Sequence, residues 1–117
     1  MRNFRELEIW KNAISMARSI YLLTDDFPIN EKYGLISQIQ RASVSIASNI
    51  AEGSSRKSEK DFTRFLEISI GSAFEVETQL IIAKEIGYIN DEQFSIIHGD
   101  LIVLQKQISK LITVIRQ

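Results

Sequence analysis

The sequence contains no cysteine, which excludes disulfide bridges and thiolate chemistry. His98 is the one histidine, so the two-histidine sites common in zinc enzymes cannot form within one chain. Di-iron helical bundles use a Glu-x-x-His motif, but the residue three positions before His98 is Ser95. We therefore expect no metal and no cofactor, and interpret His98 as a surface or boundary residue.

Long apolar runs are also missing. No stretch approaches the roughly 20 apolar residues that a membrane-spanning helix needs. The first residues, Met1 to Glu6, include three charged side chains and lack the apolar region and the small-residue cleavage site of a secretory signal. We expect a cytoplasmic protein that does not enter a membrane.

Charge of one sign is not in excess. The chain has 14 lysines and arginines against 15 aspartates and glutamates, a formal net charge of −1. Proteins that bind nucleic acid without sequence preference are normally basic, because their affinity comes from neutralising phosphates. The overall charge argues against such a function and leaves open a local basic patch.

Helix-breaking residues are few and well placed. The single proline, Pro28, and the glycines Gly53 and Gly87 divide the 117 residues, one domain's length, into helical segments. No segment alternates apolar and polar residues as a strand would. We expect helices near residues 6–24, 31–52, 58–86 and 91–116.

The residues around these breaks suit helix ends. Asn30, Ser58 and Asn90 are good N-cap residues. Gly53 and Gly87 suit the left-handed position that often follows a helix. These signals support the expected boundaries.

Apolar residues recur at alternating spacings of three and four in all four segments. This repeat is typical of helices that cross at about 20° in four-helix bundles, and short loops make neighbours antiparallel. We predict an all-α fold, an antiparallel up-down-up-down four-helix bundle in a single domain. The predicted core positions are Ile9, Ala13, Met16, Ile20, Leu23, Leu35, Ile39, Ala42, Ile46, Ile50, Phe62, Leu66, Ser69, Ala73, Val76, Leu80, Ala83, Phe94, Ile97, Leu101, Leu104, Ile108, Leu111 and Ile115.

Three helices are apolar on more than one face, although a small bundle needs only one apolar stripe per helix. The surplus predicts an exposed patch, which another copy of the chain would cover most simply. The alternative is a wide core within one protomer. The surplus residues are Leu7, Trp10, Ile14, Ala17, Tyr21, Phe65, Ile68, Ile70, Phe74, Ile81, Ile82, Ile86, Ile96, Ile102, Val103, Ile112 and Val114.

Small residues are concentrated in the second and third helices. Alanine and serine make up about half of residues 41–53, and a second cluster is Ser69, Gly71, Ser72 and Ala73. We interpret them as positions of close helix–helix approach. A serine nucleophile would need a neighbouring base, and the local sequence offers none. We expect no catalytic residues and no enzyme.

One basic cluster runs from the second loop into the third helix. Its members are Arg56, Lys57, Lys60 and Arg64. Their spacing places them on one side, where they could contact RNA, DNA or another anion. Glu59 and Asp61 lie among them, so the alternative is an ordinary solvated helix start.

Many of these residues resemble the four-helix bundle family encoded in 23S rRNA intervening sequences. The Asn49–Gly53 run is the most specific part, and the match covers essentially the whole chain. The matching segments are Phe27-Pro28, Glu31, Tyr33-Gly34-Leu35, Gln38, Arg41-Ala42, Ser45-Ile46, Asn49-Ile50-Ala51-Glu52-Gly53, Arg56, Phe65-Leu66, Gly71-Ser72-Ala73, Glu77-Thr78-Gln79-Leu80 and Gly87-Tyr88-Ile89.

The resemblance implies a ring-like homopentamer with no known catalysis and an uncharacterised role. The same family includes the accessory variability determinants of diversity-generating retroelements, which tend to be more basic and bind nucleic acid and a reverse transcriptase. The family often has proline where this chain has Ala47. Proline kinks a helix, so we expect a straighter second helix here.

Three polar residues of the second helix form a further motif. Arg41 and Glu52 lie eleven residues apart, three turns along one face, and Asn49 lies near the end of the helix. Buried polar groups need partners. We predict that Arg41, Asn49 and Glu52 bond across helices or across subunits.

The sequence therefore predicts a non-enzymatic homo-oligomeric, pentameric scaffold or binding protein, whose partners are its own copies and another protein. The alternative is an oligomer that binds RNA or DNA through the basic cluster.

Overall fold

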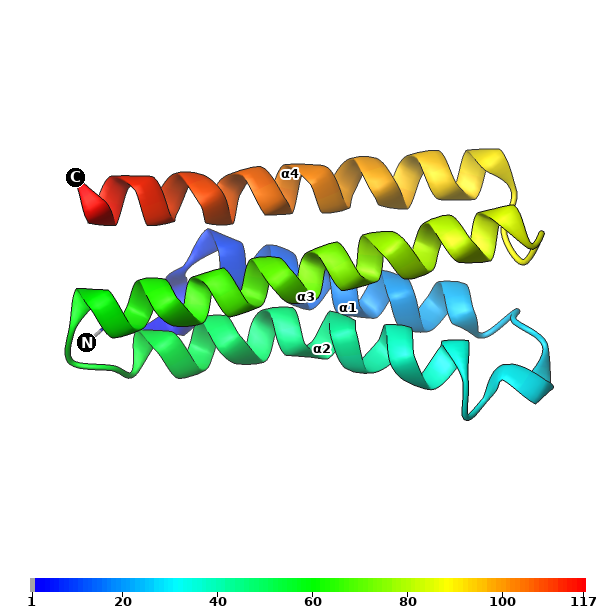
Figure 1. Ribbon diagram of the computed structural model, residues 1–117, viewed down its shortest axis with the longest axis horizontal. Coiled ribbons are helices and arrows are strands. Elements are labelled where there is room, and N and C mark those ends of the chain that lie inside the picture. Colours follow the sequence, from blue (N-terminus) through cyan, green and yellow to red (C-terminus); the bar gives the residue numbers. More distant parts are fainter. Residues whose placement is uncertain (1) are drawn as a thin grey trace.

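A computed structural model describes residues 2–117, and its elements follow one another as an antiparallel bundle of four α-helices (Figure 1). The bundle is elongated, with extents of 43 × 24 × 20 Å. The predicted fold class is confirmed. The elements are the 3₁₀ helices η1 (Phe4–Glu6) and η2 (Ile29–Glu31) and the α-helices α1 (Glu8–Thr24), α2 (Leu35–Ser54), α3 (Glu59–Glu85) and α4 (Asp91–Arg116).

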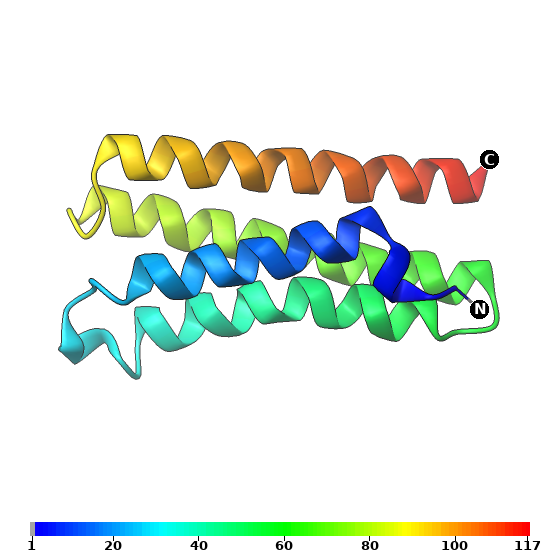
Figure 2. The same cartoon turned by 180° about the vertical axis from the view of Figure 1, so that it is seen from behind.

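Each helix packs against two others. α1 and α3 each contact both α2 and α4, while α1 does not contact α3 and α2 does not contact α4. In Figure 1, α3 lies in front of α1, and Figure 2 shows α1 in front of α3. The bundle therefore has four lines of contact between neighbouring helices, which we call seams.

The core follows the predicted periodicity. All seven core positions predicted in α3 are buried, from Phe62 to Ala83. The predicted positions that are only partly buried lie toward helix ends: Leu23, Leu35, Phe94, Leu111 and Ile115. Each large apolar side chain that is fully buried contributes about 1.5–3 kcal/mol. None of the helices formed by residues 2–117 is both long enough and apolar enough to cross a membrane.

The start of α2 differs from the prediction. Asn30 does not cap it, because residues 29–31 form η2 and α2 begins at Leu35. The Glu31 side chain explains the late start. Its Oε1 accepts from the Leu35 backbone N–H at 3.3 Å, and its Oε2 accepts from the Tyr88 hydroxyl at 2.7 Å. The Glu31 side chain therefore caps the N-terminus of α2 from a position before the helix, and it also links α2 to Tyr88 in the α3–α4 loop.

The end of α2 also differs. Gly53 was predicted to follow the helix in a left-handed conformation, but it lies inside α2 and is buried. A Cβ atom at Gly53 would lie 2.6 Å from Phe65 Cβ and 3.1 Å from Phe62 Cδ1. Glycine is required there by the close approach of α3, and α2 continues to Ser54.

The ends of α3 and α4 confirm the cap predictions. Ser58 accepts from the Asp61 N–H at 3.0 Å, and Asn90 and Gln93 form a reciprocal capping box. Gly87 adopts a positive φ of 85° after α3. The Tyr88 N–H then reaches back to the Ala83 carbonyl at 2.9 Å, which closes the end of the helix.

Candidate interaction surfaces

The α2–α3 seam is the most extensively packed of the four. The Ser45 and Ser72 hydroxyls bond to each other at 2.9 Å, and the Ser69 hydroxyl donates to the Ile46 carbonyl at 2.8 Å. These small side chains leave little distance between the two backbones. The prediction that the serines of α2 and α3 permit close approach is confirmed, and their hydroxyls serve as links between helices.

Gly71 does not take part in this approach. It is exposed, and nothing lies within 4 Å of the position that its Cβ would occupy. The same holds for Gly99 in α4. The prediction that Gly71 brings helices together is wrong within the protomer, because this residue lies on the face of α3 that points away from the core.

The polar motif of α2 is only partly engaged. Asn49 Nδ2 donates to the Ser45 carbonyl at 2.8 Å and to the Ser45 hydroxyl at 2.9 Å. Arg41 and Glu52 are exposed, and Glu52 pairs with Arg56 at 3.3 Å. Ser45 belongs to the same helix as Asn49, so within residues 2–117 none of the three residues bonds to another helix, and the prediction of bonds between helices of one protomer is wrong. Bonding across subunits stays a prediction.

The two arginines of the basic cluster lie on one aromatic ring. The Cζ atoms of Arg56 and Arg64 lie 4.8 and 5.0 Å from the centroid of Phe65. Each also has an acidic neighbour, since Arg56 pairs with Glu52 and Arg64 lies 3.9 Å from Asp61. The structure therefore brings these two cations together and partly neutralises both.

Lys57 and Lys60 are exposed and make no ion pair with any residue of 2–117. Arg2, which lies outside the predicted basic cluster, is located at the same end of the bundle. Its guanidinium binds both carboxylate oxygens of Glu59, at 2.7 and 2.9 Å, and lies over Phe62. These hydrogen bonds lower the pKa of the Glu59 carboxyl. Sequence reasoning missed Arg2 because it is 57 residues from its partner.

A polar network lies at the α3–α4 seam. His98 Nε2 bonds to Glu77 at 2.9 Å, and Gln105 Nε2 donates to the other Glu77 oxygen at 3.0 Å. The bonds from His98 and then Gln105 lower the pKa of the Glu77 carboxyl. Phe94 stacks on the imidazole with the ring centroids 4.7 Å apart. His98 is a half-buried boundary residue, as predicted.

This network offers little catalytic chemistry. Glu77 and His98 could exchange a proton, but both of the Glu77 oxygens already have partners. Within residues 2–117, no three histidine, cysteine or acidic side chains converge as ligands for a metal ion. Glu77 of α3 thus forms a polar link to His98 and Gln105 of α4.

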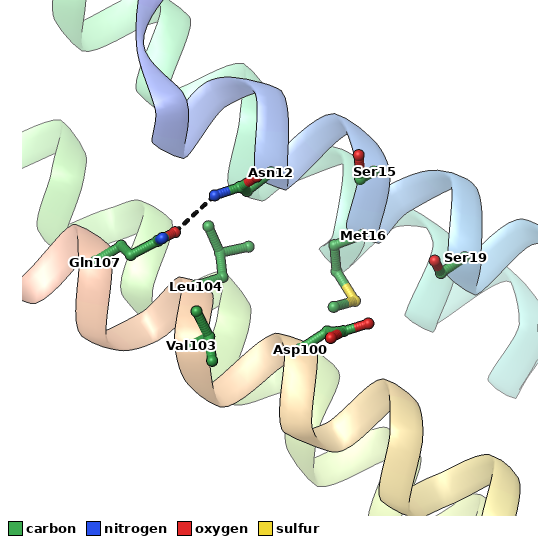
Figure 3. Close-up of a pocket in the computed structure, with 8 residues that line it drawn as sticks. All are labelled: Asn12, Ser15, Met16, Ser19, Asp100, Val103, Leu104 and Gln107. Atoms are coloured by element: carbon green, nitrogen blue, oxygen red, sulfur yellow. Dashed lines mark hydrogen bonds between the residues drawn. The ribbon is translucent and has the colours of Figure 1, made fainter.

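The α1–α4 seam is the least packed and contains a small pocket (Figure 3). Asn12 bridges it by donating to Gln107 at 2.8 Å. Met16 and Leu104 lie between the two helices, and the Asp100 carboxylate lies beside them (Figure 3). The cavity measures about 200 Å³, which is less than the roughly 300–1,000 Å³ typical of small-molecule sites. It therefore defines no ligand site by itself.

The surface carries two apolar features. We call the first the α1–α2 groove, formed by Trp10, Ile14, Ala17, Val44, Ala47, Ser48 and Ala51. The second, the α3 outer stripe, runs along the outward face of α3 and comprises Ile68, Gly71, Phe74, Thr78, Ile81 and Ile82, all exposed.

Part of the predicted apolar surplus belongs to the protomer's own core. Leu7, Trp10 and Ile70 pack partly against the core, and Ile112 is buried. Much of the rest is exposed, including Ile14 at 45% and Phe74 at 53% of their surface. The wide core therefore accounts for some of the surplus residues and the exposed patch for others. Exposed apolar side chains remain on α1, α3 and α4.

Fold and surface together define a class: a four-helix bundle with exposed apolar side chains on several of its helices. Residues 5–110 match the 23S rRNA-intervening sequence protein family, and the chain belongs to that family. The resemblance inferred from the sequence motifs is thereby confirmed.

A solved structure shares this fold. It is a protein of unknown function from the S23 ribosomal protein family of Bacteroides thetaiotaomicron VPI-5482, 29% identical to this chain. The match has a TM-score of 0.81 and covers 89% of this chain and 97% of that one. Comparison with functionally curated proteins gives no match. The family and the fold are established, while the function has to be argued from the surface.

Proposed function

We propose that this protein is a non-enzymatic, homo-oligomeric binding protein whose subunits associate through their exposed apolar faces. The observation that carries this proposal is the α3 outer stripe, where Ile68, Phe74, Ile81 and Ile82 are each more than 40% exposed. Contiguous apolar surface of this kind marks protein–protein interfaces. Another copy is the partner always present at matching concentration, and the resemblance implies five copies.

The energetic argument favours association. Covering the exposed part of a large apolar side chain contributes about 25 cal/mol per Å² of apolar area. Several such side chains in one contact offset the several kcal/mol that association costs. A stripe that spans about four turns of α3 is long enough to supply them.

The proposal is tested by measuring mass in solution. Native mass spectrometry and sedimentation velocity at 1–100 µM, in about 0.15 M salt, should show an oligomer that dissociates only on dilution. We expect five subunits. A monomer across the whole concentration range would overturn the proposal, and a different closed number would correct the subunit count alone.

The non-enzymatic part rests on the Glu77–His98 pair, which is the acid–base pair that the described surface offers. Its one further polar partner is Gln105, which bonds to the second Glu77 oxygen, and Phe94 stacks on the imidazole. We expect His98→Gln to leave assembly and ligand binding unchanged. Loss of a chemical activity in that variant would revive an enzymatic role.

A second candidate function is binding of RNA or DNA at the end of the bundle that holds Arg56, Lys57, Lys60 and Arg64. The favouring observation is that the guanidinium groups of Arg56 and Arg64 both lie against the Phe65 ring, 4.8 and 5.0 Å from its centroid. Lys57 and Lys60 have no acidic partner among residues 2–117. Repetition of a modest patch in an oligomer multiplies a weak contact into useful avidity.

The test is fluorescence anisotropy with single-stranded and duplex RNA and DNA over a range of salt concentrations. Binding through these residues should weaken with salt and be lost in Lys57→Glu/Lys60→Glu. Lys106→Glu/Lys110→Glu, with the same charge change on exposed positions of α4, is the matched control. No affinity at low salt, or equal losses in the two variants, would exclude this function.

A further inference from the structure

The α1–α2 groove is apolar and encloses a hollow of about 210 Å³. Its lining combines the small Ala17, Ala47 and Ala51 with the larger Trp10, Ile14 and Val44. Ser48 is the one polar residue in the lining. Small residues between large ones form a hollow into which a ridge of side chains from another helix can pack.

The α3 outer stripe is a row of side chains on a single helix, and its Gly71 and Phe74 also border a hollow of about 460 Å³ that α3 shares with Ile112 of α4. From Ile68 to Ile81 its members follow one another at spacings of three and four residues, and Ile82 is adjacent to Ile81, so they form one row on the helix. Phe74 is its largest side chain and lies near its middle. Gly71 destabilises an exposed helix by about 1 kcal/mol relative to alanine. Nothing in the protomer explains that glycine, and the close approach of a second chain would.

The two features cannot meet within one protomer. α3 does not contact α1, and the stripe lies on the side of α3 that faces away from the bundle. A two-fold contact would place like surfaces together, groove on groove or stripe on stripe. Groove and stripe of different copies combine a hollow with a row of side chains, and such a head-to-tail contact builds a ring or an open chain.

Charges beside the two features are also complementary. Arg18 follows Ala17 and Arg41 lies one turn before Val44, so two arginines flank the groove. Glu75 and Glu85 are exposed on the same helix as the stripe. None of these four residues makes an ion pair with any residue of 2–117. Most other charged residues of α3 either form an ion pair or belong to the basic cluster.

The features lie at about the same level along the bundle. Ile14 lies ten residues before the end of α1, Val44 nine residues after the start of α2, and Phe74 eleven residues before the end of α3. These helix ends share one end of the bundle (Figure 1). At 1.5 Å per residue, each lies about 15 Å from that end. Side-by-side copies would meet groove to stripe without sliding.

Building on the proposed self-association, we infer that the α3 outer stripe of one copy docks into the α1–α2 groove of the next. Phe74 enters the hollow between Ile14 and Val44, and Gly71 lets the helices approach closely. Arg18 and Arg41 face the glutamates of the neighbouring α3. The partner is a second copy of this chain, and the contact is head-to-tail.

Two interface variants test this inference by complementation. Val44→Glu blocks the groove and Phe74→Glu blocks the stripe, at side chains that are 43% and 53% exposed. Val103→Glu on α4, at 54% exposed, is the matched control outside both features. Circular dichroism and thermal melting confirm that all three fold.

Each interface variant alone should be monomeric, at least a hundredfold weaker in self-association than wild type. An equimolar mixture of the two should form a one-to-one heterodimer, because one intact groove and one intact stripe remain. Val103→Glu should assemble as wild type does. Native mass spectrometry distinguishes the heterodimer from either homodimer.

The outcomes separate this inference from the proposed function. If the wild type is monomeric, self-association itself fails. If the wild type is oligomeric but both variants stay oligomeric, or their mixture gives no heterodimer, the groove-to-stripe contact is wrong while self-association stands. Loss of assembly in only one variant indicates a two-fold contact and also overturns the inference.

Charge exchange gives a second readout. Arg18→Glu/Arg41→Glu and Glu75→Arg/Glu85→Arg should each weaken self-association at least tenfold. Mixing the two should restore association between unlike copies, because the groove of each variant is then opposite in charge to the stripe of the other. A ring of five would still contain at least one contact between like copies, so the mixture is read by its heterodimers rather than by closed pentamers. Unchanged association of both variants, or a mixture no stronger than its parts, would show that these charges do not meet.

Discussion

The α2–α3 and α1–α4 seams show two ways of joining neighbouring helices. At α2–α3, Gly53, Ser69 and Ser72 bring the backbones together, and hydroxyls bond across the contact. At α1–α4, Asn12 and Gln107 bridge a wider gap that holds a pocket. The first seam has no room for added atoms, while the second has unused space.

The largest expected effect comes from adding one methyl group to the tight seam. Gly53→Ala places its Cβ 2.6 Å from Phe65 Cβ, an atom that cannot move without its backbone. We expect a loss of about 2–3 kcal/mol in the free energy of unfolding.

Gly99→Ala is the control for Gly53→Ala, because nothing lies within 4 Å of its Cβ position. It should gain up to about 1 kcal/mol from helix propensity. Urea unfolding of both variants checks the pair. Equal effects in the two would show that the close approach at Gly53 carries no energetic weight.

The next largest effect is expected when a serine is replaced by leucine in the α2–α3 seam, compared with the same replacement in the α1–α4 seam. Ser72→Leu adds volume to a buried position and removes the bond to Ser45, so we expect a loss of about 1–2 kcal/mol. Ser19→Leu fills space beside Met16 in the α1–α4 pocket and should cost nothing or stabilise slightly. Thermal melting at low protein concentration measures both. A larger loss for Ser19→Leu would reverse the comparison.

A smaller effect is expected for the amides. Asn49→Leu removes two hydrogen bonds to Ser45 at a half-buried position, which should lower stability by about 1 kcal/mol. Asn12→Leu removes one bond, to Gln107, but places apolar atoms over the pocket. We expect Asn12→Leu to lower the free energy of unfolding by less than half as much as Asn49→Leu does. If Asn49→Leu changes neither stability nor oligomer size, the structural role of Asn49 is excluded.

The smallest effect concerns the α3–α4 seam, where Glu77 links the two helices by bonding to His98 and Gln105. The folded-state pKa of Glu77 is lowered, so its contribution is complete above the ordinary glutamate value of 4.5 and disappears as pH falls through the lowered value. We expect Glu77→Gln to lose less than about 1 kcal/mol near neutral pH.

Unfolding curves between pH 3 and pH 7 check the sign for Glu77. The difference between wild type and Glu77→Gln should shrink toward acidic pH. A difference that grows on acidification would contradict the lowered pKa.

The repeat of apolar residues predicted the fold and most of the core, because burial along a helix depends mainly on residues three and four apart. The residue types at the helix ends predicted the caps at Ser58, Gly87 and Asn90, because a capping residue acts on backbone groups only a few residues away. The starts and ends that depend on distant partners were missed. Glu31 caps α2 while its other carboxylate oxygen bonds to Tyr88, and Gly53 lies inside α2 where Phe65 leaves no room for a side chain.

The candidate surfaces were predicted less completely. The sequence indicated a surplus of apolar residues but could not assign each one to core or surface. Ile112 and Phe74 look alike in the pattern, yet one is buried and the other exposed. The basic cluster was found by its local spacing, whereas Arg2 and the Glu77–His98 link depend on residues far apart in the chain.

By itself, the sequence determined four antiparallel helices, their core stripe and membership of a family, because each depends on local periodicity, short loops and motifs. Only the tertiary structure decided which glycine permits close contact, which charges are paired and which apolar side chains remain exposed. Those properties depend on the side chains that a neighbouring helix brings to each seam. The groove and the stripe are visible only once the four helices have been placed around one core.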